Sequence, residues 1–372
     1  MERINTKCLD TLKFFAAFIV AVFAHYYHFI GRNPPPFESE CKWLFTHGWL
    51  MVELFFMLSG FGMYLGYADR IQERRITFKK FILKRLRKIY PLFVLTLLLV
   101  VVFEVWHINL TESTFVYQNF DLWHFFSNLI LCQTGVFGVG YSFNAPSWCI
   151  TIFFLMYIIF YIVMYYSKKK EKALCVYACL FFLASWIMIE GLSYPFILNA
   201  FFARGLASFS VGILLGYIYG LSHRLNTLLI GYLSLIILLI YTVLYNFDHV
   251  YIGYVRLLFI VVIFPAVICS VLYIPWLNRL MSFEPLARLG SLSLGIYLFH
   301  YIIQCAISDI NIAFGLQLLY SRKHMLVIYS LLVVAIPAVY EKFFAAKVIA
   351  LVERTAKAFL KRKVPRTEQV VD

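Results

Sequence analysis

Hydrophobic positions along the chain fall into ten long apolar runs, separated by shorter stretches that hold most of the charged residues. A helix of about 20 apolar residues crosses roughly 30 Å of hydrocarbon. The pattern therefore predicts an all-α polytopic membrane protein with about ten transmembrane helices. The predicted spans are 12–30, 48–67, 89–106, 148–166, 173–190, 201–220, 228–245, 255–273, 289–306 and 324–340. A weaker apolar segment, Trp123–Phe137, is too short and too polar to span comfortably, so we predict a re-entrant or interfacial piece there.

The composition supports a membrane protein over a soluble one. Of the 372 residues, 62% are hydrophobic and 14% are charged, whereas a soluble domain is about half apolar and a quarter charged. In water such a chain would expose large apolar patches, and a bilayer removes that cost. The eight cysteines lie mostly inside spans and show neither a CxxC pair nor a metal-ligand spacing, so we predict packing roles and no metal site.

The basic residues are sorted along the chain in the way that membrane proteins sort them. The formal net charge is +14. If the N-terminus is cytoplasmic, 27 of the 33 Lys and Arg residues fall on the cytoplasmic side. This sorting predicts that both termini are cytoplasmic, and it explains the charge without a nucleic-acid partner. The other six basic residues are Arg32, Lys42, Arg204, Arg256, Arg322 and Lys323.

The chain divides into a transmembrane domain, 1–345, and a basic tail, 346–372. The tail mixes apolar residues at helical spacing with Lys and Arg, which predicts an amphipathic helix on the anionic inner leaflet. A solvated tail is the alternative for the last ten residues.

Among the ionisable residues inside predicted spans, where desolvation is costly and needs a reason, four stand out as candidates. They are His25, Glu53, Arg204 and His300. At about 1.5 Å of rise per residue, each lies roughly 5 to 9 Å from the outer end of its span. Four helices therefore bring one ionisable group each to a common level, which makes this level a candidate active site.

A buried carboxylate needs a partner or a raised pKa, and His25 lies at the depth of Glu53. We therefore predict a His25–Glu53 pair, in which the carboxylate orients the imidazole for general-base catalysis. Two alternatives remain open at this point. The histidines could be ordinary packing residues, and Arg204 could extend its side chain to the outer headgroups.

The loop 70–88 is much more basic than topology alone requires. Nine Lys and Arg residues lie within it, against one acid, Glu73. The four that directly precede the third span are placed to bind a phosphorylated cytoplasmic ligand. They are Lys84, Arg85, Arg87 and Lys88. Contact with lipid headgroups is the alternative.

Five segments, taken in chain order, resemble the membrane-bound acyltransferase-3 family, which O-acetylates bacterial surface glycans. The resemblance is to members without a fused extracytoplasmic hydrolase-like domain. The segments are 9–13 followed by His25; 52–61, which contains Glu53 and Ser59; 84–91; 144–148, which ends at Trp148; and 289–300, which ends at His300.

The resemblance implies an acyl-CoA donor on the cytoplasmic side and an acceptor on the outer side. It carries the family's catalytic histidine to His25 and its basic pair to Arg85 and Lys88. Lys13 falls near the family's basic position in the first span, but eleven residues separate it from His25 where the family has ten. Many members also carry an acid shortly after the tryptophan of the fourth segment, where this chain has Phe153 and Phe154.

These observations together predict a transmembrane acyltransferase domain in the bacterial cytoplasmic membrane. The expected reaction transfers an acetyl or other short acyl group from acyl-CoA to a hydroxyl of a surface or lipid-linked glycan. Acetyl-CoA is expected as a substrate, without a bound cofactor. Lys13, Ser59, Trp148, Arg204 and His300 are candidates to hold the acceptor or support the site. The alternative functions are a transporter, for which repeated halves with broken spans are expected and not seen, and a scaffold, which leaves the ionisable residues unexplained.

Overall fold

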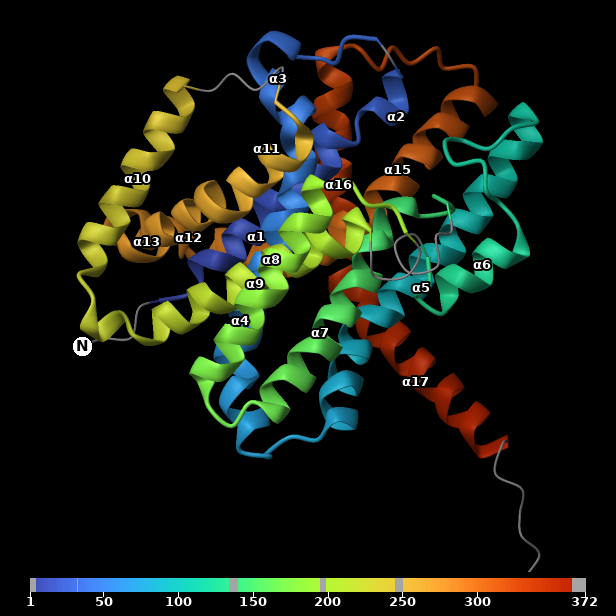
Figure 1. The fold of residues 1–372 in the computed structure, drawn as a ribbon. Coiled ribbons are helices and arrows are strands. Elements are labelled where there is room, and N and C mark those ends of the chain that lie inside the picture. The colour runs from blue at the N-terminus through green and yellow to red at the C-terminus, as the bar shows by residue number, and fades with distance from the viewer. Residues whose placement is uncertain (1–4, 32, 134–139, 195–198, 245–249, 363–372) are drawn as a thin grey trace, which may run out of the picture.

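The prediction of an all-α polytopic protein is confirmed. A computed structural model describes residues 5–31, 33–133, 140–194, 199–244 and 250–362. Within these ranges, ten helical stretches are long and apolar enough to cross a membrane, and β-structure is limited to isolated bridges (Figure 1). The stretches are Cys8–Ile30, Glu38–Gln72, Phe78–Thr111, Ala145–Tyr166, Lys170–Ile189, Ala200–Gly220, Thr227–Leu244, Ile252–Tyr273, Glu284–Ala313 and Lys323–Phe343.

Several of these stretches are composite. The first consists of α1 (Cys8–Ile19), a π-helical turn at Val20–Ala24 and α2 (Tyr27–Ile30). The second joins α3 (Glu38–His47) to α4 (Met51–Gln72). The eighth joins α11 (Ile252–Leu258) to α12 (Phe264–Tyr273), and the ninth joins α14 (Glu284–Leu289) to α15 (Ser293–Ala313).

The remaining stretches are single helices or, in one case, a helix with a short 3₁₀ turn before it. They are α5 (Phe78–Thr111), α7 (Trp148–Tyr166), α8 (Lys170–Ile189), α9 (Ala200–Gly220), α10 (Thr227–Leu244) and α16 (Lys323–Phe343). A further short helix, α13 (Pro275–Met281), connects the eighth stretch to the ninth.

The segment predicted to be re-entrant or interfacial contains one short helix, α6 (Leu122–Leu129). At about 1.5 Å per residue its eight residues extend only about 12 Å, too little to span. The Asp121 carboxylate caps its first turn by accepting a hydrogen bond from the His124 amide, 2.9 Å away. Residues 134–137 of the predicted segment lie outside the described residues.

The connections between helices gather at two ends of the bundle. The α4–α5 and α7–α8 connections lie at one end, and the α2–α3 and α15–α16 connections lie at the other (Figure 1). We call the first the basic end, because it carries the basic loop 70–88 and the lysines at 168–170.

The closest helix contact joins α4 to α9. A side chain added at Gly60 would collide with the Phe209 carbonyl, and one added at Gly212 would collide with the Met57 carbonyl. Small residues at both faces let the two backbones touch, as in many membrane helix pairs. This contact fixes the rotation of α4 against α9 and therefore decides which polar groups of the two helices meet.

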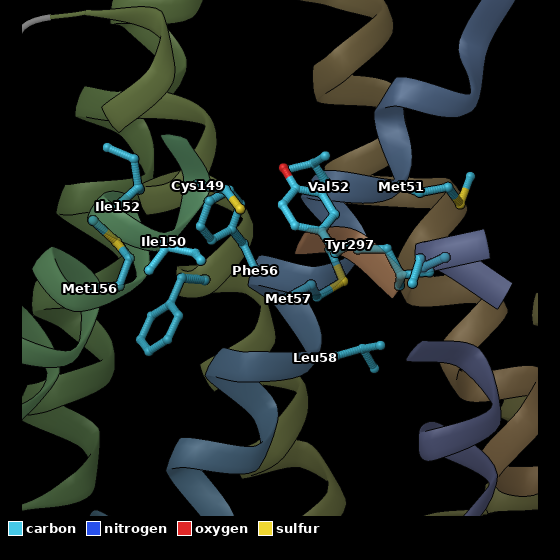
Figure 2. Packing of buried hydrophobic residues seen from close by; sticks show 14 of the residues in the cluster. Met51, Val52, Phe56, Met57, Leu58, Cys149, Ile150, Ile152, Met156 and Tyr297 are labelled. Carbon is cyan, nitrogen blue, oxygen red and sulfur yellow. The ribbon is translucent and has the colours of Figure 1, made fainter. Parts of the chain in front are cut away.

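The core around the site is formed mainly by α4, α7 and α15. Figure 2 shows Phe56 and Met57 of α4 packed among Cys149 and Ile150 of α7 and Tyr297 of α15. All five side chains are buried. The polar groups described below are therefore held in a dry, close-packed framework.

The tail is helical where it is described. Helix α17 (Ala345–Arg362) starts two residues after α16 and contacts α5. Its placement on the inner leaflet stays a prediction, and residues 363–372 lie outside the described residues.

Candidate active site

The two in-span histidines form a pair. The Nδ1 of His25 lies 2.9 Å from the Nε2 of His300, and the two rings are nearly parallel, with centroids 4.9 Å apart. His25 comes directly after the π-helical turn of the first span, and His300 lies in the middle of α15. His300 is fully buried and His25 is half-buried, so His25 is the accessible member of the pair.

The hydrogen bonds of the pair determine which nitrogen of His25 is free. The Nδ1 of His300 lies 2.7 Å from the Tyr297 carbonyl oxygen. Because a carbonyl only accepts, this Nδ1 carries the proton, and the Nε2 of neutral His300 is an acceptor. His25 must then donate through its own Nδ1, which leaves its Nε2 with a lone pair. His25 is thus in the tautomer that a general base requires.

The π-helical turn explains how the longer Lys13–His25 spacing is tolerated. The His25 amide donates to the Val20 carbonyl, five residues earlier, at 3.1 Å. Such a turn accommodates one extra residue in an α-helix. It therefore offsets most of the rotation that the additional residue between Lys13 and His25 would otherwise cause.

The predicted His25–Glu53 pair is wrong. Glu53 is bound by Arg204, whose Nε donates to Oε1 at 2.6 Å and whose Nη2 donates to Oε2 at 3.2 Å. The close α4–α9 contact brings this guanidinium to the carboxylate, and the two-pronged geometry satisfies both oxygens. The prediction rested on matched depth, and depth along a helix carries no information about which way each side chain faces.

Arg204 is buried, which removes the alternative that it extends to the headgroups. Its guanidinium lies over the ring of Trp148, 4.8 Å from the ring centroid. Trp148, at the start of α7, thus supports the ion pair from the side. A second guanidinium, Arg256 of α11, has its Nε 3.9 Å from Glu53 Oε1.

A cavity of about 400 Å³ runs inward from the basic end. Three predicted basic residues line it: Lys13, Arg85 and Lys88. The Arg85 guanidinium lies over the Tyr67 ring at 4.4 Å. Its Nε and Nη2 are buried and have no hydrogen-bond partner among the described residues. Buried cationic donors without partners are suited to an anionic ligand.

Of the other predicted site residues near this cavity, one lines it and two do not. Ser59 lines the cavity and shares a hydrogen bond with the Tyr157 hydroxyl at 3.2 Å. Lys84 is exposed, with its ammonium 5.6 Å from the Tyr67 ring centroid. Arg87 is exposed and is not a lining residue of this cavity. The structure therefore places Arg85 and Lys88 together on the cavity and leaves Lys84 and Arg87 outside it.

The inner end of the cavity reaches the residue that binds the histidine pair. Tyr297 lines the cavity with its side chain and accepts from His300 with its carbonyl. The segment 144–148 holds this region of α15 in place. The Tyr297 hydroxyl donates to the Pro146 carbonyl, and the Asn144 amide donates to the Leu298 carbonyl at 2.9 Å.

A second polar layer lies next to the His25–His300 pair and was not predicted from the sequence. Gln304 donates to the His25 carbonyl at 2.9 Å, and its Oε1 accepts from His28 Nδ1 at 2.7 Å. The Tyr117 hydroxyl lies 3.2 Å from His28 Nε2. Burial raises the pKa of Tyr117 far above its ordinary value, so this hydroxyl stays protonated and donates.

A signal for two of these residues is present in the sequence. His28 lies three residues after His25, and Gln304 lies four residues after His300, so each continues a polar stripe on one helix face. Tyr117 lies in a connection without regular structure, and no pattern points to it.

One of the comparisons with known proteins identifies the family of the chain. A family model described as an acyltransferase domain matches residues 6–341. The chain therefore belongs to the acyltransferase-3 family, and it is a multi-pass membrane acyltransferase. Neither the curated proteins nor the solved structures include a match.

Proposed function

We propose that this protein is an O-acyltransferase that moves an acetyl or other short acyl group from cytoplasmic acyl-CoA to a hydroxyl group. The observation that carries the proposal is the position of the cavity. It connects Arg85, whose buried donors have no partner in the described part of the chain, with Tyr297, whose carbonyl binds His300 of the histidine pair. A donor entering from that end would deliver its reactive group toward a poised base.

The proposed donor site matches the chemistry of acyl-CoA. Arg85 and Lys88 would bind phosphate oxygens, with the planar guanidinium of Arg85 giving two-pronged contacts. The cavity wall beyond them is mainly apolar and includes Phe55, Ile150 and Phe153. Such a wall suits the thin pantetheine arm of acyl-CoA.

The proposed chemistry starts at the free nitrogen of His25. Its Nε2 removes the proton of the acceptor hydroxyl, and the oxygen attacks the thioester carbonyl carbon. The C–S bond breaks, and the thiolate of CoA takes the proton back from the imidazolium. The neighbouring His300 accepts a hydrogen bond from His25 Nδ1 throughout and so stabilises the transient charge. His25 acts as the base and His300 as a positioning residue.

The remaining parts of the proposal follow from the family resemblance. The acceptor is a surface or lipid-linked glycan that reaches His25 from the end opposite the basic end. The basic end faces the cytoplasm, and the membrane is the bacterial cytoplasmic membrane. Acyl-CoA is a substrate that leaves as CoA, so no resident cofactor is needed.

Donor binding tests the cavity directly. The double variant Arg85→Glu with Lys88→Glu should weaken acetyl-CoA binding by at least about tenfold, since each reversal replaces an attraction with a repulsion. Affinity would be measured by calorimetry on purified protein. The matched control reverses Lys168 and Lys169, which are exposed at the same end and do not line the cavity. Equal affinities in both double variants would assign Arg85 and Lys88 to lipid contact and topology.

A further inference from the structure

Glu53 and the two arginines beside it form a group of three charges that is not neutral. Two guanidinium groups, Arg204 and Arg256, face one carboxylate. The group therefore carries one excess positive charge, inside helical stretches that are predicted to span the membrane. A charge in this environment is costly unless something pairs with it.

The excess charge belongs to Arg256. Arg204 already satisfies both oxygens of Glu53 with two hydrogen bonds. Arg256 reaches the carboxylate only at 3.9 Å, which is too long for a hydrogen bond. Its Nε is buried and has no hydrogen-bond partner among the described residues. Glu53 does not need Arg256 for charge balance, so the position of Arg256 calls for another anion.

Arg256 is also the more accessible of the two cations. Its side chain is 19% exposed, against 10% for Arg204. Its guanidinium lies 4.9 Å from the centroid of the Trp49 ring, which supports the planar group by a cation–π contact. Glu53 and Arg204 lie near the beginnings of α4 and α9, and Arg256 lies near the beginning of the eighth helical stretch, Ile252–Tyr273.

Aromatic rings connect this group to the proposed catalytic pair, starting from Trp148, which contacts Arg204 and whose ring lies 4.9 Å from the ring of Phe201. Tyr141 is exposed, and its ring lies 5.9 Å from the ring of Phe201 and 5.9 Å from that of Tyr117. Tyr117 in turn binds His28, which stacks on His25 with ring centroids 5.4 Å apart. Rings with an apolar face and a polar edge can bind molecules that are apolar in one part and polar in another, as sugar rings are.

We propose that Arg256, supported by Arg204, binds an oxyanion of the acceptor, either a sugar carboxylate or a phosphate. This inference rests on the proposed function and names the acceptor class for the same site. An oxyanion at Arg256 would pair with its unsatisfied donor and neutralise the excess charge. The aromatic rings would support the sugar between this anion and His25. The acceptor is therefore an acidic glycan or a phosphate-linked one.

The test compares purified wild-type protein with Arg256→Gln, which removes the excess charge and leaves the Arg204–Glu53 pair intact. Two pairs of probes separate the two sources of the anion. The first is a glucuronate-containing oligosaccharide and its carboxyl-reduced form. The second is a neutral oligosaccharide, free and linked to a polyprenyl pyrophosphate. Arg322→Gln is the matched control, because it removes an exposed arginine at the same end of the bundle.

The expected result is that one anionic probe binds wild-type protein at least about tenfold more tightly than its neutral partner. Arg256→Gln should abolish that difference, and Arg322→Gln should keep it. A gain confined to the acidic oligosaccharide assigns the carboxylate, and a gain confined to the lipid-linked probe assigns the phosphate. If neither anionic probe shows a gain that depends on Arg256, the inference is overturned.

Acetyl-CoA binding is measured on the same samples, so that this failure is distinguishable from failure of the proposed function. Normal donor binding and acyl transfer without any role for Arg256 would overturn only the acceptor assignment. If wild-type protein neither binds acetyl-CoA nor transfers an acyl group, the proposed function itself is overturned.

Discussion

At the residue scale, one hydrogen bond to a backbone carbonyl sets the state of the site. The Tyr297 carbonyl determines where His300 carries its proton, and His300 determines the same for His25. The predicted role of an orienting partner for His25 is thus met by a neutral imidazole instead of the carboxylate of Glu53. The sequence placed both histidines at one level, but only the packed helices show which groups meet.

This arrangement makes a testable prediction about His300. Replacing it with glutamine keeps an acceptor that Nδ1–H of His25 can reach, whereas leucine removes it. His300→Leu should lower kcat by roughly 10²-fold, within the range for positioned proton transfer. His300→Gln should retain clearly more activity, and KM for acetyl-CoA should be unchanged in both, because His300 does not line the donor cavity.

Steady-state kinetics on both purified variants would check this. Equal loss of kcat in the glutamine and leucine variants would mean that His300 serves packing. A parallel rise of KM for acetyl-CoA would point to a collapsed cavity.

At the element scale, the packing of the helices decides which of the polar side chains in the spans meet. Hydropathy predicted all ten spans, because each span has to be apolar whatever its neighbours are. The partners of Glu53 were not predictable in this way, because they depend on the rotation that Gly60 and Gly212 allow between α4 and α9. The π-helical turn before His25 could not be predicted either, because its residues are ordinary apolar residues of a membrane helix.

The α4–α9 contact predicts a difference between two glycines of the same helix. Gly60→Ala forces a methyl group against the Phe209 carbonyl, while Gly66 has open space around it. Gly60→Ala should lower stability by about 1–3 kcal/mol, as overpacking does. Gly66→Ala should be neutral or slightly stabilising, since alanine favours the helix. Thermal unfolding of both variants in detergent would measure this, and equal melting temperatures would contradict the packing described for α4 and α9.

At the scale of the whole molecule, the sorting of basic residues predicts the orientation. The structure places the basic loop 70–88 at one end of the bundle, together with the α7–α8 connection (Figure 1). A reporter fused after residue 372 should therefore be cytoplasmic, and one inserted near Glu112 should be external. Reporter activity on the same side of the membrane at both positions would contradict the ten-span topology.

The orientation matters because it decides from which side each substrate arrives. With the basic end in the cytoplasm, acyl-CoA would enter by the cavity at Arg85, and the acceptor would approach the half-buried His25 from outside. The two substrates would then meet within the membrane, where His25 would act as the base.

The most direct test of this central claim is acetyl transfer by purified His25→Ala protein in lipid, with acetyl-CoA binding measured on the same samples. We predict that transfer falls by about 10²–10⁴-fold, the usual contribution of a positioned general base. Donor affinity should stay at the wild-type value, because His25 is not a lining residue of the donor cavity. Near-normal transfer by a well-folded His25→Ala protein would contradict the account.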